Sequence, residues 1–288
     1  MTLHFILACH NRRKSTLSCL RSLAISCRAA KVSYDVTLFD DGSSDGTSAS
    51  VLSEFPNTTV CYGNGSNFWA KSMAGAESNV LSKLKEDFDS DDFIVWINDD
   101  ITLDEDSIGR ILSVSNEFNS RSILVGAMRD PDSGVTTYSG LNRRGLHPLS
   151  FRIQEPSSVV QEVEAFNGNL VMVPVSSAKI LQGIDDGYSH ALADIDYGLR
   201  ATAHGIKNLL APGTYGVCSR NISPPLGIRE EWRRFIGPKG AGNVSSMKKI
   251  LELISPKSWP FYFLLSYSTW IARYSLRTVI FAVKNLKK

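Results

Sequence analysis

Three adjacent polar residues, Asn98, Asp99 and Asp100, come directly after the apolar run at residues 93–97. This run is short and rich in β-branched residues, which predicts a buried strand rather than a helix. Neighbouring carboxylates repel each other unless a positive group lies between them, and Mg²⁺ is commonly held by one or two carboxylates together with substrate phosphates. Asn and Asp also commonly form turns. The segment therefore predicts either a metal and phosphate site or an ordinary turn.

A second acidic pair, Asp40 and Asp41, follows the apolar run at residues 36–39 and precedes Gly42 and Gly46. A carboxylate here can accept a hydrogen bond from the N–H of a pyrimidine base or from a ribose hydroxyl. The glycines would let the backbone approach such a ligand closely. A surface loop rich in turn-forming residues is the alternative.

Asp194 lies where the pattern of residues 194–205 predicts the start of a helix, and Asp196 follows it. An Asp at this position is often only a helix cap. The positive end of the helix dipole also favours the carboxylate form, so Asp194 is expected to be deprotonated at neutral pH and able to take a proton from a hydroxyl. Asp196 is the second choice for this role.

Two amides, Asn167 and Asn169, flank Gly168 before the apolar run at residues 170–174. They suit either a turn or the binding of sugar hydroxyls. We take both as candidate acceptor-binding residues, together with His190 and Asp196.

The elements that position these residues follow from hydrophobic patterning. Apolar runs at residues 3–9, 36–39 and 58–62 alternate with helical patterns, and residues 134–145 are expected to form a loop. This βαβαβ order predicts an α/β fold with a doubly wound, mostly parallel sheet that binds ligands beyond the carboxyl ends of its strands. The acidic pairs after residues 39 and 97 then share one edge of the sheet.

Composition narrows the class of protein. With 288 residues, 43% of them hydrophobic, the chain can bury a full core, and a net charge of +2 does not favour a nucleic-acid partner. The five cysteines include no Cys-x-x-Cys pair, which predicts free thiols and a cytoplasmic location. The apolar run at residues 3–9 has no basic residue before it and is expected to be a first strand rather than a signal peptide.

Three segments carry a family resemblance: FILACHNR at residues 5–12, VTLFDDGSSDGT at residues 36–47 and WINDDI at residues 96–101. Together they resemble the amino-terminal half of the family 2 inverting glycosyltransferases, which have the Rossmann-like GT-A fold. The resemblance extends to about residue 221. It implies that Asp41 recognises the nucleotide base and that residues 98–100 match the Asp-x-Asp metal motif, with Asn98 and Asp100 in its first and third places. Asn98 departs from the usual Asp, so most weight falls on Asp100.

Residues 194–200 resemble the Glu-Asp-x-Asp region of bacterial galactofuranosyl- and rhamnosyl-type members, although Ala193 replaces the Glu. This likeness implies that Asp194 is the catalytic base. Relatives often supply a further metal ligand, typically a histidine, near residues 211–221, where this chain offers only Cys218, Asn221 or a water. The donor-binding residues implied by the resemblance are Asn11, Arg12, Asp40, Asp41, Asn67, Trp69 and Asp99.

The composition changes after residue 221, where Pro224 and Pro225 predict a boundary between a GT-A domain at residues 1–221 and a helical extension at residues 222–288. The uncharged run at residues 258–272 is shorter than the ~20 residues that span a bilayer. Polar and basic residues recur at helical spacing in an otherwise aromatic segment, namely Ser266, Thr269, Arg273, Arg277 and Lys284. This pattern is typical of a helix in a membrane interface, and the alternative is a helix packed on protein.

These expectations combine into one function. We expect an inverting glycosyltransferase that uses Mn²⁺ or Mg²⁺ and moves a sugar from a UDP- or dTDP-sugar to a hydroxyl of a lipid-linked glycan. The setting implied by the resemblance is bacterial O antigen, lipopolysaccharide or capsule synthesis at the cytoplasmic face of the inner membrane, with no nucleic acid involved. A sugar-1-phosphate nucleotidyltransferase and a non-catalytic scaffold are the alternatives. The former would carry a glycine-rich loop where this chain has residues 10–13.

Overall fold

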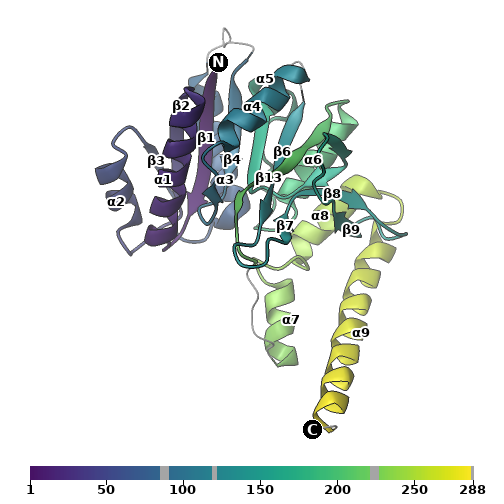
Figure 1. Ribbon diagram of the computed structural model, residues 1–288. Helices are drawn as coiled ribbons and strands as arrows, with labels where there is room; N and C mark the ends of the chain where they lie inside the picture. The colour runs from purple at the N-terminus through teal and green to yellow at the C-terminus, as the bar shows by residue number, and fades with distance from the viewer. Residues whose placement is uncertain (85–90, 119–121, 221–226, 287–288) are drawn as a thin grey trace.

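The computed structural model describes residues 1–84, 91–118, 122–220 and 227–286, with side chains as far as residue 275. The strands of its large sheet are β1 (Thr2–Cys9), β2 (Ser33–Asp40), β3 (Thr59–Tyr62), β4 (Phe93–Ile97), β5 (Thr102–Leu103), β6 (Ile123–Arg129), β7 (Thr136–Tyr138), β10 (Gln161–Val163), β12 (Leu170–Pro174) and β13 (Asn208–Val217). A small sheet contains β8 (Gly140–Arg143), β9 (Phe151–Ile153) and β11 (Ala165–Phe166). The helices are α1 (Arg13–Ala30), α2 (Thr47–Glu54), α3 (Phe68–Lys83), α4 (Ser107–Glu117), α5 (Val175–Leu181), α6 (Ala193–Ala203), α7 (Ile228–Ile236), α8 (Val244–Ile254) and α9 (Trp259–Leu286) (Figure 1).

The order of strands in the large sheet is β10-β13-β6-β12-β4-β1-β2-β3. Strand β1 runs parallel to β2 and β4, and β2 runs parallel to β3, so their carboxyl ends share one edge, which we call the carboxyl edge. Strand β12 is antiparallel to β4, with Leu170 opposite Ile97. Because of this reversal, β12 begins at the carboxyl edge, and the residues just before it lie beside those that follow β4.

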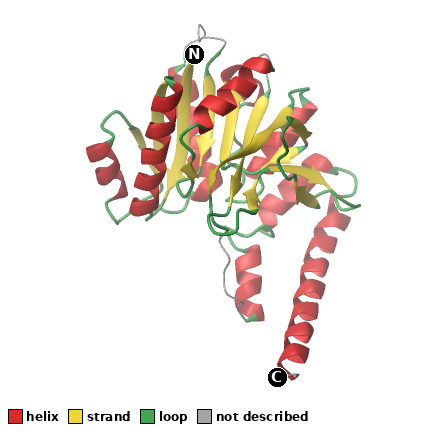
Figure 2. Cartoon of the chain, viewed as in Figure 1, coloured by secondary structure: helices red, strands yellow, loops and turns green. Residues whose placement is uncertain are grey.

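Helices cover both faces of the large sheet (Figure 2). Alternating side chains of the strands fill the two hydrophobic layers beneath them. Phe5 packs in the layer that contains Leu20 of α1 and Ile108 of α4. Ile6 points to the opposite layer, which contains Met73 of α3. Burying a side chain of this size contributes about 1.5–3 kcal/mol, so the alternation decides which helices cover each face.

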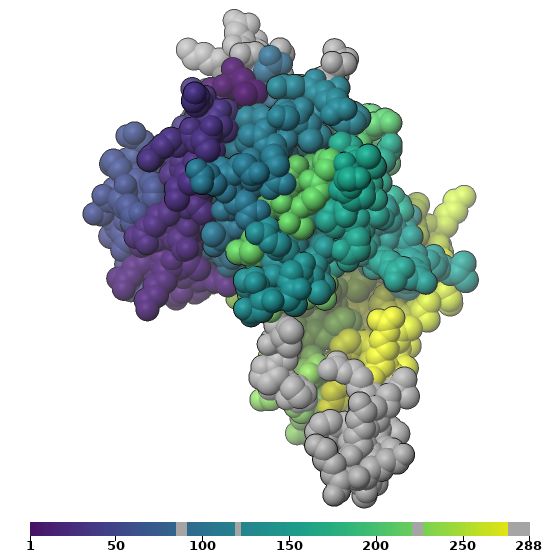
Figure 3. All heavy atoms as spheres, viewed as in Figure 1, coloured from purple at the N-terminus to yellow at the C-terminus, as the bar shows by residue number. Residues whose placement is uncertain are grey.

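The C-terminal helices divide between the domain and a projection beneath it (Figures 1 and 3). Ile250 of α8 is fully buried in the layer formed by α3, α5 and α6. Helices α7 and α9 instead pack on each other, with the rings of Trp232 and Trp270 centred 5.0 Å apart. No helix among the described residues is both long and apolar enough to cross a bilayer.

The mostly parallel α/β sheet expected from the sequence is confirmed, and the runs at residues 93–97 and 170–174 form β4 and β12 with the expected ends. The loop expected at residues 134–145 is wrong, because β7 and β8 lie within it. Strand β7 is held by antiparallel pairing with the preceding strand β6, which its short, polar sequence does not reveal. The expected domain boundary near residue 221, with Pro224 and Pro225, lies outside the described residues.

Candidate active site

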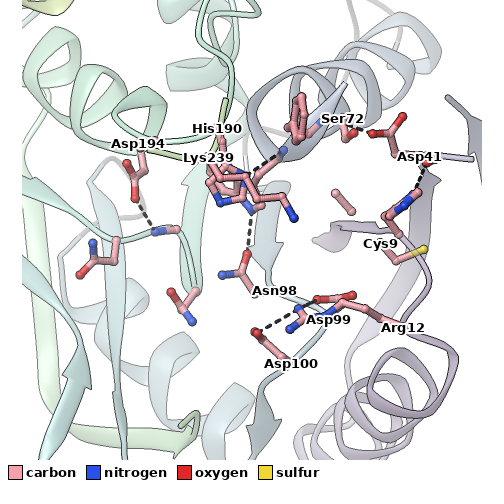
Figure 4. Close-up of a pocket in the computed structure, with 18 of the residues that line it drawn as sticks. Cys9, Arg12, Asp41, Ser72, Asn98, Asp99, Asp100, His190, Asp194 and Lys239 are labelled. Atoms are coloured by element: carbon pink, nitrogen blue, oxygen red, sulfur yellow. Dashed lines mark hydrogen bonds and ion pairs between the residues drawn. The ribbon is translucent and has the colours of Figure 1, made fainter. Parts of the chain in front are cut away.

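A cavity of about 660 Å³ opens at the carboxyl edge of the sheet (Figure 4). Its walls come from the ends of β1, β2 and β4, the turn before β12, the first turns of α3 and α6, and the segment between α7 and α8. The candidate site residues that line it are Arg12, Asp41, Trp69, Asn98, Asp99, Asp100, Asn167, Asn169, His190 and Asp194. The three acidic segments, which are far apart in the sequence, thus meet around one space.

Asp41 is buried at one end of this cavity and organises the segment before α3. Its Oδ1 accepts a hydrogen bond from the backbone N–H of Gly65 at 2.9 Å, and its Oδ2 accepts from Asn67 and Phe68 at 2.9 and 3.0 Å. Gly42 has a φ of +71°, and a Cβ there would lie 2.8 Å from the nitrogen of Gly65. Glycine therefore permits the close approach of the two loops that enclose the Asp41 carboxylate.

Arg12 relieves the repulsion expected between Asp99 and Asp100. One nitrogen of its guanidinium lies 2.7 Å from Oδ1 of Asp99 and 3.0 Å from Oδ2 of Asp100. Asp99 is 4% exposed, and burial raises its pKa to about 6 although Arg12 acts to lower it. The positive group between the two carboxylates is thus supplied by the chain itself.

The residues around Asp100 show which of them fit a divalent cation. The Asp100 side chain is 24% exposed and lines the cavity, which suits a cation held by one carboxylate and a substrate diphosphate. The amide oxygen of Asn98 already accepts a 2.8 Å hydrogen bond from the indole N–H of Trp69. Cys218 lies 3.7 Å from Asp100, but burial, followed by the charge of Asp100, raises its pKa to about 12, so its thiol stays protonated and is a poor ligand for a hard cation. Asn221 lies outside the described residues.

No cluster of three or more His, Cys, Asp or Glu side chains among the described residues forms a ready-made metal site. The side chains therefore fit a cation that Asp100 holds together with a bound diphosphate, rather than a cation held by protein ligands alone.

Asp194 lies in the first turn of α6, facing the cavity from the side opposite Asp41 (Figure 4). Its oxygens accept hydrogen bonds from the backbone N–H of Ile195 at 2.9 Å and of Gly168 at 3.3 Å. A Cβ at Gly168 would meet the ring of Trp69 at 2.7 Å, so a larger residue could not bring this N–H as close to Asp194.

Burial raises the pKa of Asp194 to about 6, although the hydrogen bonds from Ile195 and Gly168 lower it. The expectation that the helix terminus favours the charged form therefore omitted a larger effect, the loss of solvent around the carboxyl group. With a pKa of about 6 the group is still mostly deprotonated at neutral pH, and it is well matched to general-base chemistry.

His190 stands beside Trp69, and its Nδ1 accepts the backbone N–H of Trp69 at 3.3 Å. Burial, followed by the nearby charge of Lys239, lowers the pKa of His190 to about 4. The imidazole is therefore neutral in the physiological range, and it can act as a hydrogen-bonding group but not as a cation.

Four predicted ligand-binding residues do not line the cavity: Asp40, Asn11, Asn67 and Asp196. Asp196 is buried, where its oxygens accept from Arg200 at 2.7 Å and from the Tyr188 hydroxyl at 3.0 Å. Asp40 and Asn11 hold the loop after β2, since they accept the backbone N–H groups of Ser43 and Ser44, each at 2.8 Å. The structure thus gives these side chains supporting contacts rather than a face on the cavity.

The sequence-based prediction missed several residues that do line the cavity, among them Ser72, Tyr138 and Lys239. Lys239 belongs to GPKGAGN at residues 237–243, just before α8. A lysine in a glycine-rich segment ahead of a helix is a signal that could have been used. The family resemblance ends near residue 221, so it implies no role for this segment.

No protein-family model matches the chain. The chain is 23% identical, over 211 residues, to the N-acetylglucosaminyl-diphospho-decaprenol L-rhamnosyltransferase of Mycobacterium tuberculosis, in a match that covers 67% of this chain and 68% of the relative.

Similar solved structures include S. aureus TarS 1–349 in complex with UDP-GlcNAc (TM-score 0.58, 14% identity, 87% of this chain and 66% of that one). The mannosyltransferase PcManGT from Pyrobaculum calidifontis in complex with GDP-Man and Mn²⁺ has a TM-score of 0.56 at 14% identity, over 92% of this chain and 69% of that one. GalNAc-T7 with UDP, GalNAc and Mn²⁺ has a TM-score of 0.59 at 10% identity, over 91% of this chain and 49% of that one. The chain spans only 60% of another TarS 1–349 structure.

These three solved proteins are GT-A family glycosyltransferases. The GT-A fold is thereby confirmed. Glycosyltransferase, the enzyme class that the motifs predict, is also borne out, because it is the class of each protein named in these comparisons.

Proposed function

We propose that this protein is an inverting glycosyltransferase that moves a sugar from a UDP- or dTDP-sugar to a hydroxyl of a lipid-linked glycan. The observation that carries this proposal is that Asp41, Asp100 and Asp194, from three separate segments, line one cavity of about 660 Å³. That volume lies within the usual range for small-molecule sites.

The donor lies between Asp41 and Asp100. The carboxylate of Asp41 faces the nucleoside, and the side chain of Trp69 forms part of the wall beside the sugar. Asp100 would hold Mn²⁺ or Mg²⁺, which neutralises negative charge on the diphosphate when it is bound. Two of the similar structures contain Mn²⁺, which supports this assignment.

The acceptor approaches from the side of Asp194. Its hydroxyl oxygen attacks the anomeric carbon while the bond from that carbon to the diphosphate oxygen breaks, and the hydroxyl proton passes to Asp194. Asn167 and Asn169 also line the cavity and are the candidates for binding sugar hydroxyls, although Asn169 is buried and its amide lies 3.6 Å from the sulfur of Cys218. Attack from the face opposite the leaving group inverts the anomeric configuration.

The name of the mycobacterial relative specifies a diphospho-decaprenol acceptor, and this supports a lipid-linked acceptor here. The wider setting we propose is synthesis of a bacterial surface polysaccharide, such as an O antigen, lipopolysaccharide or capsule, by a cytoplasmic enzyme on the inner membrane. Helix α9 offers a surface for this contact, because Phe261, Leu264 and Ile271 are 62%, 67% and 52% exposed on one face. Its other side packs on protein, where Ser266 hydrogen-bonds His147 at 3.0 Å.

The test is a panel of nucleotide-sugars incubated with a prenyl diphosphate-linked N-acetylglucosamine acceptor, with and without Mn²⁺. We expect Mn²⁺-dependent release of nucleoside diphosphate and a product whose anomeric configuration, measured by NMR, is opposite to that of the donor. Retained configuration would overturn the mechanism. Formation of pyrophosphate from a nucleoside triphosphate and a sugar 1-phosphate would identify a nucleotidyltransferase, and nucleotide binding without turnover would identify a scaffold.

A further inference from the structure

We propose that Lys239, on the segment that joins α7 to α8, binds a diphosphate group inside the cavity, so that the C-terminal extension completes the active site. This inference rests on the proposed function. It adds to that function a residue that follows the segments whose sequence motifs resemble glycosyltransferases, which end near residue 221.

The position of Lys239 is the first observation. It lines the cavity together with Ala241, although both follow the predicted GT-A domain in the sequence. In Figure 4 the side chain of Lys239 overlies His190 and directs its amino group toward the middle of the cavity, between the sides that carry Asp194 and Asp41. Lys239 is exposed, so its ammonium group is accessible to a ligand that enters the cavity.

The charges of the lining are the second observation. Four carboxylates line the cavity, those of Asp41, Asp99, Asp100 and Asp194. The guanidinium of Arg12, which also lines the cavity, already pairs with Asp99 and Asp100. Lys239 takes part in none of the ion pairs formed by the described residues, whereas nearby Lys249 is 2.7 Å from Asp185. A diphosphate entering a cavity rich in carboxylates needs a cation that is not already paired, and the Lys239 ammonium meets that need.

The segment that carries Lys239 is held in a defined position on both sides. The carbonyl oxygen of Pro238 accepts a 2.7 Å hydrogen bond from the hydroxyl of Ser189, which is next to His190. The carbonyl oxygen of Gly242 accepts a 2.8 Å hydrogen bond from the Tyr267 hydroxyl on α9. Lys239 is therefore a fixed part of the cavity wall, and the ordering cost of binding falls mainly on its own side chain.

Two glycines of this segment, Gly240 and Gly242, lie where no larger residue fits. A Cβ on Gly240 would collide with the carbonyl oxygen of Phe235, and a Cβ on Gly242 would collide with the ring of Phe235. The segment thus folds closely over the end of α7, which turns Lys239 back toward the cavity. Asn243 then caps α8, because its side chain accepts the backbone N–H of Ser246 at 3.2 Å.

The proposed reaction contains two sources of a diphosphate: the nucleotide-sugar donor and the lipid-linked acceptor. Both present the same oxyanions to an ammonium group. A lysine is a compact charge with rotatable donors, so Lys239 is suited to either source, and the experiment has to distinguish them.

The experiment compares Lys239→Met and Lys239→Arg with the wild-type full-length protein. The matched control is Lys257→Met, which removes an exposed lysine of the same extension that does not line the cavity. Calorimetry measures the affinities for UDP, dTDP and UMP, and steady-state assays measure KM for the prenyl diphosphate-linked acceptor. Circular dichroism and thermal unfolding check that every variant is folded.

If Lys239 binds the donor diphosphate, Lys239→Met weakens UDP and dTDP binding about ten- to hundred-fold and changes UMP affinity much less, because UMP lacks the second phosphate. If Lys239 binds the acceptor, nucleotide affinities stay the same and the acceptor KM rises about ten-fold or more. In either case Lys239→Arg keeps most of the affinity, and Lys257→Met matches the wild type. Unchanged values for UDP, dTDP and acceptor in a folded Lys239→Met protein would overturn the inference, whereas a wild-type protein that binds no nucleotide would overturn the proposed function itself.

Discussion

The indole nitrogen of Trp69 donates a 2.8 Å hydrogen bond to the side-chain oxygen of Asn98. The contact gives a physical reason for an amide in the first place of the acidic motif. An aspartate there would also accept this hydrogen bond, but it would add a third negative charge beside Asp99 and Asp100. Because its oxygen already accepts the indole N–H, we expect Asn98 to act mainly through this contact at the cavity wall.

We therefore expect Asn98→Ala to act on stability and Asp100→Ala to act on metal-dependent binding. Loss of the Trp69 contact should lower the free energy of unfolding by about 1 kcal/mol, measured by urea denaturation. Adding Mn²⁺ should raise the UDP affinity of Asn98→Ala by a factor within about two-fold of the wild-type factor, and it should not raise the UDP affinity of Asp100→Ala. Equal loss of the Mn²⁺ effect in both variants would show that Asn98 changes partner when the donor binds.

Asp194 and Asp196 form a natural pair for separating catalysis from stability. We expect Asp194→Asn to lower kcat about 10²- to 10⁴-fold with little change in UDP affinity, because only the proton acceptor is lost. Asp196→Asn weakens the buried contact with Arg200 and should lower the unfolding temperature, while the folded fraction keeps substantial activity. Full transferase activity in Asp194→Asn would refute its assignment as the base.

The pKa of Asp194 sets the expected pH profile. Since the base must be deprotonated and its pKa in the free protein is raised to about 6, kcat/KM should fall about ten-fold per unit below pH 6 and level off above pH 7. His190 cannot cause this inflection, because burial lowers its pKa to about 4. The profile of a His190→Gln variant should keep the same midpoint, and a midpoint that disappears with His190 would contradict the assignment.

The raised pKa of Asp194 also makes the stability of the folded protein depend on pH. Its pKa rises from 3.8 in the unfolded chain to about 6 in the folded protein, so the folded state binds more protons over that interval. The contribution of Asp194 to folding is therefore favourable at low pH and is lost as the pH rises through 6. Asp194→Asn should thus unfold at a higher temperature than the wild type at pH 8, and the difference should shrink at pH 4.

Arg12 competes with a cation for the same carboxylate, because its guanidinium is 3.0 Å from Asp100. Arg12→Gln should raise the affinity of the nucleotide-free protein for Mn²⁺, measured by electron paramagnetic resonance. It should also weaken UDP binding in EDTA, since a positive charge near the diphosphate is lost. Arg13→Gln, an exposed neighbour outside the cavity lining, serves as the control. Unchanged Mn²⁺ and UDP affinities in Arg12→Gln would show that the ion pair persists in function.

The outward face of α9 should determine membrane binding. A variant that combines Phe261→Ser, Leu264→Ser and Ile271→Ser should bind anionic phosphatidylglycerol vesicles at least ten-fold more weakly than the wild type in co-sedimentation, because each large apolar group contributes about 1.5–3 kcal/mol when buried. A variant with Val159→Ser and Ile180→Ser removes exposed apolar groups of the main domain and should match the wild type. Equal vesicle binding by all three proteins would exclude this face of α9 as the membrane-binding surface.

The strands that the sequence predicted best are those with a clear local pattern. Strands β4 and β12 are apolar runs bounded by polar residues, so their ends follow from composition alone. Strands β7 and β8 are short and partly polar, and they are held in place by pairing, β7 with the preceding strand β6 and β8 with the more distant β11. The antiparallel direction of β12 depends on its long-range pairing with β4, and it is this direction that brings Asn167 and Asn169 to the carboxyl edge.

The residues of the candidate site also divide into those that lie in recognisable segments and those whose place depends on packing. The family resemblance identified Asp41, Asp100 and Asp194, because each lies in a recognisable segment. The resemblance placed Asp194 ahead of Asp196, but which of the two faces the cavity depends on how α6 is rotated against the sheet. Lys239 was missed because its place in the cavity depends on the packing of a distant extension.

The hydrogen bond from the Tyr267 hydroxyl to the carbonyl oxygen of Gly242 joins α9 to the glycine-rich segment that forms part of the cavity wall. If α9 binds lipid as proposed, a lipid or detergent that shifts this helix would also shift the glycine-rich segment that carries Lys239. We therefore expect protein prepared in different detergents to show different turnover numbers, although every carboxylate of the cavity stays intact.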